Sequence, residues 1–184
     1  MFTLPELEAA ARLVHRHMEP TPQYAWPTLA DRLGAEVWVK HENHGPTGAF
    51  KVRGGITFLD WLAREHPGYG GIITATRGNH GQSQARAATA LGLRAVIYVP
   101  HGNSAEKNAA MRAFGAELRE FGADFDEARQ EAMRVADAEG CFRCRPSIPN
   151  WCAASRAMRW SSSAPRHVCT PSMSRSAAGP ASAA

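Results

Sequence analysis

The sequence predicts an α/β fold with a parallel sheet and helices on both of its faces. Three segments typical of strands, residues 72–75, 95–99 and 117–121, alternate with three typical of helices, residues 80–91, 105–114 and 124–139. Gly92, Gly115 and Gly140 follow these helices, where glycine allows the chain to turn out of a helix. Strands joined through helices of this length form right-handed crossovers, which makes neighbouring strands parallel.

The preceding residues predict a helix, a turn, a strand and a second helix, in that order. Thr3 and Glu6 form a capping box, and apolar residues recur at helical spacing until Pro20 ends the helix. A short turn over residues 29–33 ends at Gly34, and residues 36–42 alternate as a strand does. Helical spacing returns at Lys51 and stops before residue 67.

Residues 141–184 break this pattern. They contain nine Ser, five Pro and no Leu, and they show neither helical nor strand periodicity, so we expect an irregular tail. The chain therefore divides into residues 1–50, 51–140 and 141–184. All four cysteines lie in the tail, where Cys141 and Cys144 have CxxC spacing. We consider a redox or metal role for them improbable, because prolines rather than a helix follow the pair.

The charge distribution excludes a nucleic-acid-binding surface on the predicted domain. The net charge of +4 comes from the tail, which holds six Arg and no acid, whereas residues 1–140 hold 15 basic and 17 acidic side chains. No apolar run approaches the roughly 18 residues of a membrane span, and the N-terminus does not have the pattern of a signal peptide. We expect a cytoplasmic protein that binds neither nucleic acid nor membranes, and no metal site, because the histidine pairs 15/17 and 41/44 lack acidic or cysteine partners in sequence.

Two loops follow predicted strands and carry the candidate chemistry, because ligands of parallel sheets bind at the carboxyl ends of strands. The first places Lys51 at a helix start, where the helix dipole disfavours a cation and so favours the neutral amine that forms an imine. On position alone, Lys51 is better explained as a solvated helix residue. The second loop runs from Thr76 to His80 and offers backbone N–H groups to a carboxylate or phosphate. Thr and Asn also serve there as ordinary helix caps.

Together the two loops, residues 42–55 and 74–83, resemble the pyridoxal-phosphate enzymes of the serine/threonine dehydratase family. These enzymes share the tryptophan synthase β-subunit fold, and the resemblance covers roughly residues 20–140, the N-terminal half only. It implies that residues 1–50 belong to a larger cofactor domain and residues 51–140 to a smaller one. It also implies pyridoxal 5'-phosphate as cofactor, bound covalently by Lys51, with Phe50 preceding it in the family's Ser/Ala-Phe-Lys motif.

The resemblance assigns the second loop as well. It implies that Asn79 hydrogen-bonds the phenolic oxygen of the cofactor ring. Thr76, Gly78 and His80, together with Asn79, would hold the carboxylate of the substrate. Thr76 stands where many relatives have Ser, a change that keeps the hydroxyl group.

The implied activity is that of an ammonia-lyase, or dehydratase, which converts threonine or serine to a 2-oxo acid and ammonia. The substrate would be a small amino acid, and family members are usually homo-oligomers. A β-replacement enzyme or a racemase of the same fold remains an alternative, as does a non-catalytic remnant. The family's Gly-rich phosphate loop and the polar residue facing the pyridine nitrogen normally lie beyond residue 140.

Codon degeneracy suggests why the tail differs from the rest. Reverse-translated and read one base earlier, residues 149–161 can encode an amphipathic helix, and residues 171–181 a strand leading into a Gly-rich turn. We hypothesise that a frameshift near residues 141–148 removed the C-terminal half and impaired the enzyme. Sequencing of the coding DNA tests this.

Overall fold

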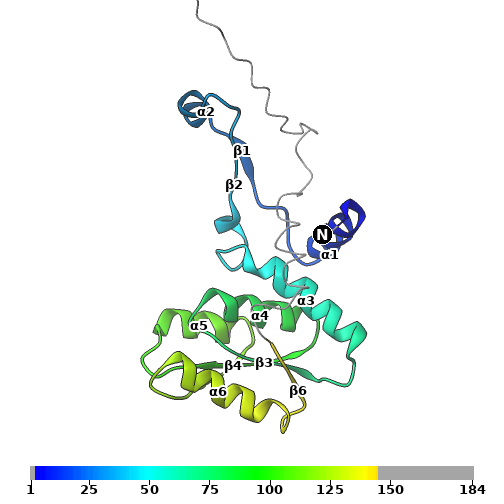
Figure 1. The fold of residues 1–184 in the computed structure, drawn as a ribbon, viewed down its shortest axis with the longest axis vertical. Coiled ribbons are helices and arrows are strands. Elements are labelled where there is room, and N and C mark those ends of the chain that lie inside the picture. Colours follow the sequence, from blue (N-terminus) through cyan, green and yellow to red (C-terminus); the bar gives the residue numbers. More distant parts are fainter. Residues whose placement is uncertain (1–2, 145–184) are drawn as a thin grey trace, which may run out of the picture.

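The computed structural model describes residues 3–144, and its centre is a parallel sheet of four strands (Figure 1). The strand order is β5-β4-β3-β6. The strands are β3 (Gly71–Ala75), β4 (Arg94–Val99), β5 (Glu117–Glu120) and β6 (Cys141–Arg143). The helices that connect them are α4 (Asn79–Ala90), α5 (Ala105–Ala113) and α6 (Phe125–Ala136).

Both faces of the sheet are covered by helices, as the sequence predicts. Successive strand residues point to opposite faces, so Ile72 and Ile97 are buried on one side while Ile73 and Val96 pack with α6 on the other. Figure 1 shows α4 and α5 on one side of the sheet and α6 on the opposite side.

The path of the chain through the sheet reverses direction at β3. From β3 the chain moves outward to β4 and β5, then returns through α6 to β6 at the other edge. Because crossovers keep one hand, this reversal places α6 on the opposite face from α4 and α5. The strand order therefore reverses at β3, and ligands of α/β proteins bind at such switch points.

Helices α1 (Leu4–His15) and α3 (Lys51–Glu65) pack on the same side of the molecule as α4. The predicted capping box is present, since the Thr3 backbone N–H donates to the Glu6 carboxylate at 2.7 Å. The apolar side of α3 buries Ile56, Phe58 and Leu59 completely or nearly so. This burial fixes α3 against the rest of the fold.

Residues 20–44, here called the arm, extend away from the parallel sheet (Figure 1). The arm contains β1 (Gln23–Ala25) and β2 (Trp38–Lys40), which pair antiparallel, with α2 (Pro27–Leu33) between them and the 3₁₀ helix η1 (Glu42–His44) after them. The strand predicted over residues 36–42 is shorter, and the predicted turn before Gly34 is a helix. The sequence did not predict β1, because three residues between prolines have no detectable period.

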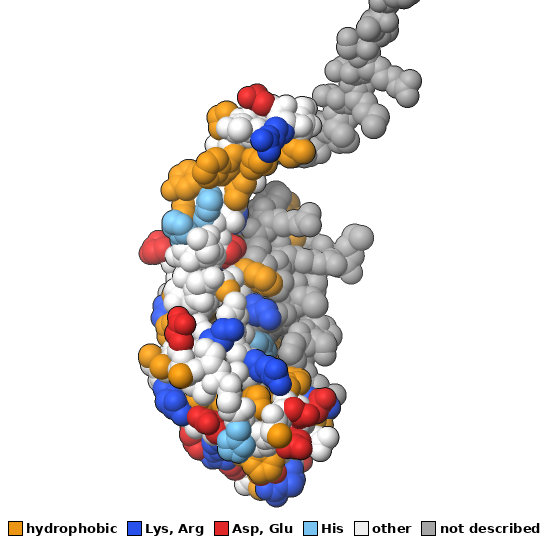
Figure 2. Space-filling model, turned by 90° about the vertical axis from the view of Figure 1, so that its left-hand side faces the viewer, with side chains coloured by type: hydrophobic (Ala, Val, Ile, Leu, Met, Phe, Trp, Pro, Cys, Tyr) orange, Lys and Arg blue, Asp and Glu red, His pale blue; other side chains and the backbone are white. Residues whose placement is uncertain are grey.

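Hydrophobic side chains gather on the arm, as Figure 2 shows. Five large ones are exposed there: Tyr24, Trp26, Leu29, Leu33 and Trp38.

Strand β6 corrects the prediction that the chain is irregular from residue 141 onward. Cys141 and Phe142 pair in parallel register with Gly71 and Ile72, and the Cys144 N–H continues the ladder by donating to the Ile73 carbonyl at 2.9 Å. So short a strand depends on pairing with β3 rather than on its own composition. The rest of the predicted tail, including the hypothesised frameshifted segments, lies outside the described residues. Among residues 3–144, no helix has the length and apolar character needed to cross a membrane.

Candidate functional site

The two candidate loops meet because α3 and α4 lie side by side and start at the same end. The Ser83 hydroxyl donates to the Lys51 carbonyl at 2.6 Å, and Gly55 faces both Ser83 and Ala87. A β-carbon on Gly55 would lie 2.7 Å from Ser83 Oγ and 2.9 Å from the Ser83 carbonyl oxygen, so only glycine permits this approach. Lys51, the first residue of α3, is thereby brought level with the first turns of α4.

The loop between β3 and α4 is held by hydrogen bonds at Thr76 and is exposed to solvent at Asn79. Thr76 is buried, accepts a hydrogen bond from the Gly78 N–H at 3.2 Å, and its own N–H donates to the Tyr98 carbonyl. Gly78 is half-buried and Asn79 is exposed, so the amide side chain and the helix start face solvent. The loop can therefore receive a ligand without rearrangement of β3.

His80 is a neutral group near the lysine. Its side chain is 6% exposed, and burial, followed by the positive charge of Lys51, lowers the pKa of His80 to about 4. Its Nε2 lies 3.4 Å from the Thr74 hydroxyl, which in turn donates to the Cys144 carbonyl at 3.1 Å. At neutral pH His80 can contribute hydrogen bonding and shape to the loop but not a positive charge.

The predicted site residues thus occupy two neighbouring segments. Phe50 is the exposed N-cap of α3, and Lys51 is half-buried directly after it. Thr76, Gly78, Asn79 and His80 lie on the loop and first turn of α4. The amine of Lys51 is the type of group that reacts with an aldehyde, and the open loop offers N–H donors to an anion, so the donor set fits the aldehyde end of pyridoxal phosphate.

A buried ionic cluster, which the sequence did not reveal, ties α3 to the arm. Arg53 is 2% exposed and donates to both carboxylate oxygens of Glu42, at 2.9 and 3.1 Å. Thr21 donates its hydroxyl to Glu42 at 2.7 Å, and Lys40 Nζ donates to the Thr21 carbonyl at 2.9 Å. Burial works to raise the pKa of Glu42, but the hydrogen bonds from Arg53 and Thr21 outweigh it and hold this pKa below its usual value.

Arg53, the member of this cluster that lies in α3, comes two residues after Lys51. It therefore fixes the start of the helix that carries the candidate lysine. In the sequence, the acidic Glu42 at the start of the first loop and the basic Arg53 just after Lys51 were the only sign of this cluster. Their ion pair is visible only in the fold.

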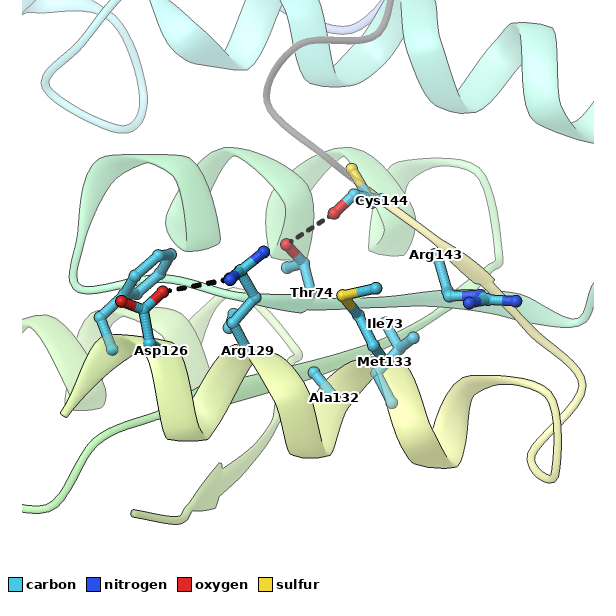
Figure 3. Close-up of a pocket in the computed structure, with 10 residues that line it drawn as sticks. Ile73, Thr74, Asp126, Arg129, Ala132, Met133, Arg143 and Cys144 are labelled. Carbon is cyan, nitrogen blue, oxygen red and sulfur yellow. Dashed lines mark hydrogen bonds and ion pairs between the residues drawn. The ribbon is translucent and has the colours of Figure 1, made fainter. Parts of the chain in front are cut away.

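A cavity of about 460 Å³ opens on the other face of β3, between the sheet and α6 (Figure 3). Arg129 extends from α6 toward Thr74 and Cys144, and forms an ion pair with Asp126 at 3.3 Å. The cavity is lined by Ile73, Thr74, Ala75, Phe125, Asp126, Arg129, Ala132, Met133, Arg143 and Cys144. The sequence did not predict it because its walls depend on the position of β6.

The CxxC cysteines are buried structural residues. Cys141 and Cys144 are free thiols on and after β6, and burial raises the pKa of Cys144 to about 12. A thiol with so high a pKa stays protonated, which disfavours redox and metal chemistry. Cys152 and Cys169 lie outside the described residues.

Both the sequence and the fold of the chain match those of known proteins. The family model of pyridoxal-phosphate dependent enzymes matches residues 14–158. The biosynthetic L-threonine dehydratase of Pasteurella multocida is 39% identical over 119 residues, which cover 65% of this chain and 23% of that protein. The L-threonine ammonia-lyase of Thermotoga maritima is 32% identical over 146 residues, covering 79% of this chain and 36% of that protein.

A solved structure agrees with the sequence comparison. The processed form of threonine deaminase isoform 2 from Solanum lycopersicum superposes with a TM-score of 0.73 at 28% identity, covering 85% of this chain and 47% of that chain. The chain is thus homologous to threonine dehydratases, and it spans about a quarter of the first curated relatives and about half of the solved chain.

Proposed function

The chain belongs to the family of pyridoxal-phosphate dependent enzymes, and from this we propose that Lys51 binds pyridoxal 5'-phosphate covalently in an ammonia-lyase site for threonine or serine. The observation that carries the proposal is the parallel contact of α3 and α4, which brings Lys51 beside the first turns of α4, the helix that the loop from Thr76 to Asn79 leads into. The relatives at 39 and 32% identity, whose names describe threonine dehydratase and ammonia-lyase activity, support this choice over a racemase or a β-replacement enzyme.

Each proposed residue has one task. Lys51 Nζ would hold the cofactor and, once its amine is free again, would accept the proton from the substrate's α-carbon. Asn79 would orient the cofactor ring from the start of α4, and Phe50 directly precedes the lysine as the N-cap of α3. The loop from Thr76 to His80 holds the substrate's carboxylate. When bound, the cofactor supplies the electron sink that makes removal of the α-proton and loss of the β-hydroxyl group feasible.

We propose that cofactor binding and turnover are impaired in this chain by itself. The family's Gly-rich phosphate loop, expected beyond residue 140, lies outside the described residues, 3–144. Each charge-assisted hydrogen bond to the phosphate contributes about 1.5 to 3 kcal/mol, so the loss of several makes the cofactor dissociate readily. A non-catalytic remnant is the second candidate function.

An absorbance titration with pyridoxal phosphate tests the proposal. We expect the full chain to develop an imine band near the edge of the visible range that saturates only at high cofactor concentration, because binding is impaired, and the Lys51→Ala variant to develop none. Lys107→Gln is the matched control, because it removes a different lysine and should keep the band. If the band forms equally in the Lys51→Ala variant, the assignment of Lys51 is wrong.

The same preparation separates the two candidate functions. Addition of L-threonine with release of a 2-oxo acid, followed with a phenylhydrazine reagent, supports the lyase. A weak or absent band without any release of 2-oxo acid supports the remnant.

A further inference from the structure

Thr74 is the polar residue of an otherwise apolar strand. Strand β3 is buried along its whole length, and its other residues are glycine, isoleucine and alanine. A buried hydroxyl costs free energy unless it finds hydrogen-bond partners, so a valine would fill the same space at less cost if the role were packing alone. The hydroxyl of Thr74, which is 3% exposed, lies between polar atoms of two other segments, Cys144 and His80.

These two partners determine where the protons lie. The Thr74 hydroxyl has one proton, and the Cys144 carbonyl, 3.1 Å away, can only accept it (Figure 3). His80 Nε2 lies 3.4 Å from the same hydroxyl oxygen, whose lone pairs remain as acceptors. A hydrogen bond between these two atoms therefore requires a proton on Nε2. Because burial lowers the pKa of His80 to about 4, the ring is neutral at physiological pH and carries a single ring proton.

The hydrogen bonds of Thr74 join the end of β6 to the start of α4 across β3. Cys144 directly follows β6, and His80 is the second residue of α4. The loop before α4 is already held on the side of β4, where the Thr76 N–H donates to the Tyr98 carbonyl at 3.0 Å. His80 holds the other end of this loop, and its ring, at 6% exposure, lies inside the fold. The residues between the two anchors are those that the proposed function assigns to the substrate's carboxylate.

We propose that Thr74 is a positioning residue of the candidate site: its hydroxyl accepts a hydrogen bond from the Nε2–H of His80 and so holds the ring, and the first turn of α4 with it, in one tautomer and one orientation. The inference rests on the proposed function, since it takes the loop from Thr76 to Asn79 to hold a carboxylate. It also changes the role that the family resemblance implies for His80. The ring acts through the backbone, and the N–H groups of the loop donate to the carboxylate in its place.

Nitrogen NMR of the imidazole tests this assignment on the full chain without cofactor. The protonated and unprotonated nitrogens of a neutral histidine ring have well separated ¹⁵N frequencies, so the spectrum identifies the tautomer. The signals of His80 are those that disappear in His80→Gln. At neutral pH we expect the ring proton of His80 on Nε2 in the wild-type chain.

Two substitutions of Thr74 test the origin of the tautomer. Thr74→Val removes the acceptor, and Thr74→Ser keeps it. Loss of one hydrogen bond of ordinary strength shifts an equilibrium about fivefold, so the ratio of the Nε2–H to the Nδ1–H tautomer should fall by this factor in Thr74→Val and return in Thr74→Ser. Thr89→Val is the matched control, because the Thr89 hydroxyl also donates to a carbonyl, that of Phe114 at 2.8 Å, from the other end of α4. It should leave the tautomer of His80 unchanged.

A second measurement connects the tautomer with the site. In the pyridoxal-phosphate titration, the concentration of L-threonine that half-changes the imine band should rise about fivefold in Thr74→Val. Thr74→Ser and Thr89→Val should keep the wild-type concentration. A residue that only stabilised the fold would lower the free energy of unfolding without changing this concentration.

Three results would overturn the inference: a ring proton on Nδ1 of His80 in the wild-type chain, an unchanged tautomer ratio in Thr74→Val, or an equal change in Thr89→Val. The wild-type spectrum decides even where Thr74→Val does not fold. An imine band that depends on Lys51, together with a proton on Nδ1, refutes this inference alone. The expected tautomer without any imine band refutes the proposed function and leaves Thr74 as an anchor of α4.

Discussion

Replacement of Gly55 by alanine should force α3 away from α4 and destabilise the chain. The added β-carbon would lie 2.7 Å from Ser83 Oγ and 2.9 Å from the Ser83 carbonyl oxygen. Overpacking of this kind costs about 1 to 3 kcal/mol, and loss of the Ser83–Lys51 hydrogen bond costs about 1 kcal/mol more. The better helix propensity of alanine returns about 1 kcal/mol. We therefore expect a net loss of about 1 to 3 kcal/mol in the free energy of unfolding.

Urea unfolding followed by circular dichroism measures this change. The matched control is Gly68→Ala, because a β-carbon on Gly68 would meet no atom within 4 Å. Its effect should stay within about 0.5 kcal/mol. Adding Ser83→Ala to Gly55→Ala should recover part of the loss, since the hydroxyl contact disappears while the contact with the backbone oxygen remains.

Wild-type or higher stability of Gly55→Ala would refute the close approach of the two helices. So would a loss of equal size in Gly68→Ala. In either case the contact between α3 and α4 would not hold Lys51 level with the start of α4.

Two further predictions concern buried ionisable groups. The pKa of His80 is about 4 in the folded chain and 6.5 in an ordinary histidine. As the pH falls, the unfolded chain therefore binds a proton at this residue before the folded chain does. The contribution of His80 to the free energy of unfolding should be constant above about pH 6.5 and decrease by about 3 kcal/mol toward pH 4. Urea unfolding across this range should show a smaller decrease in His80→Gln than in wild type. Part of the decrease remains in the variant because His15 and Glu42, whose pKa values are also lowered, still contribute. Arg53→Met leaves the half-buried Glu42 carboxylate without its arginine partner and should cost about 1.5 to 3 kcal/mol. The double variant with Glu42→Gln should be more stable than Arg53→Met alone in thermal unfolding, and if it is not, the pair does not stabilise the arm against α3.

The sequence predicted those parts of the fold whose signals are local. The helices after β3, β4 and β5 each bury one side, and their spacing shows this without knowledge of neighbours. The three-residue strands β1 and β6 escaped prediction because their pairing partners determine them: Cys141 becomes a strand residue beside Gly71. A segment of three residues is too short to show either the helical or the strand period of apolar residues.

The candidate site divides in the same way. Lys51, and Asn79 with the loop that joins it to β3, could be proposed from the sequence because each lies next to a predicted strand or helix start. The pairing of Arg53 with Glu42 and the hydrogen bond between Thr74 and His80 join different elements. Such contacts follow from the packing of the elements, which the one-dimensional pattern does not specify.

Attachment of pyridoxal phosphate to one particular lysine is the central claim, and borohydride reduction tests it most directly. The reduced adduct is stable, so digestion and mass spectrometry can locate it among the three lysines of the chain. The account predicts modification of Lys51, with Lys40 and Lys107 unmodified at equal reagent. Modification spread evenly over the three lysines, or confined to Lys40 or Lys107, would contradict it.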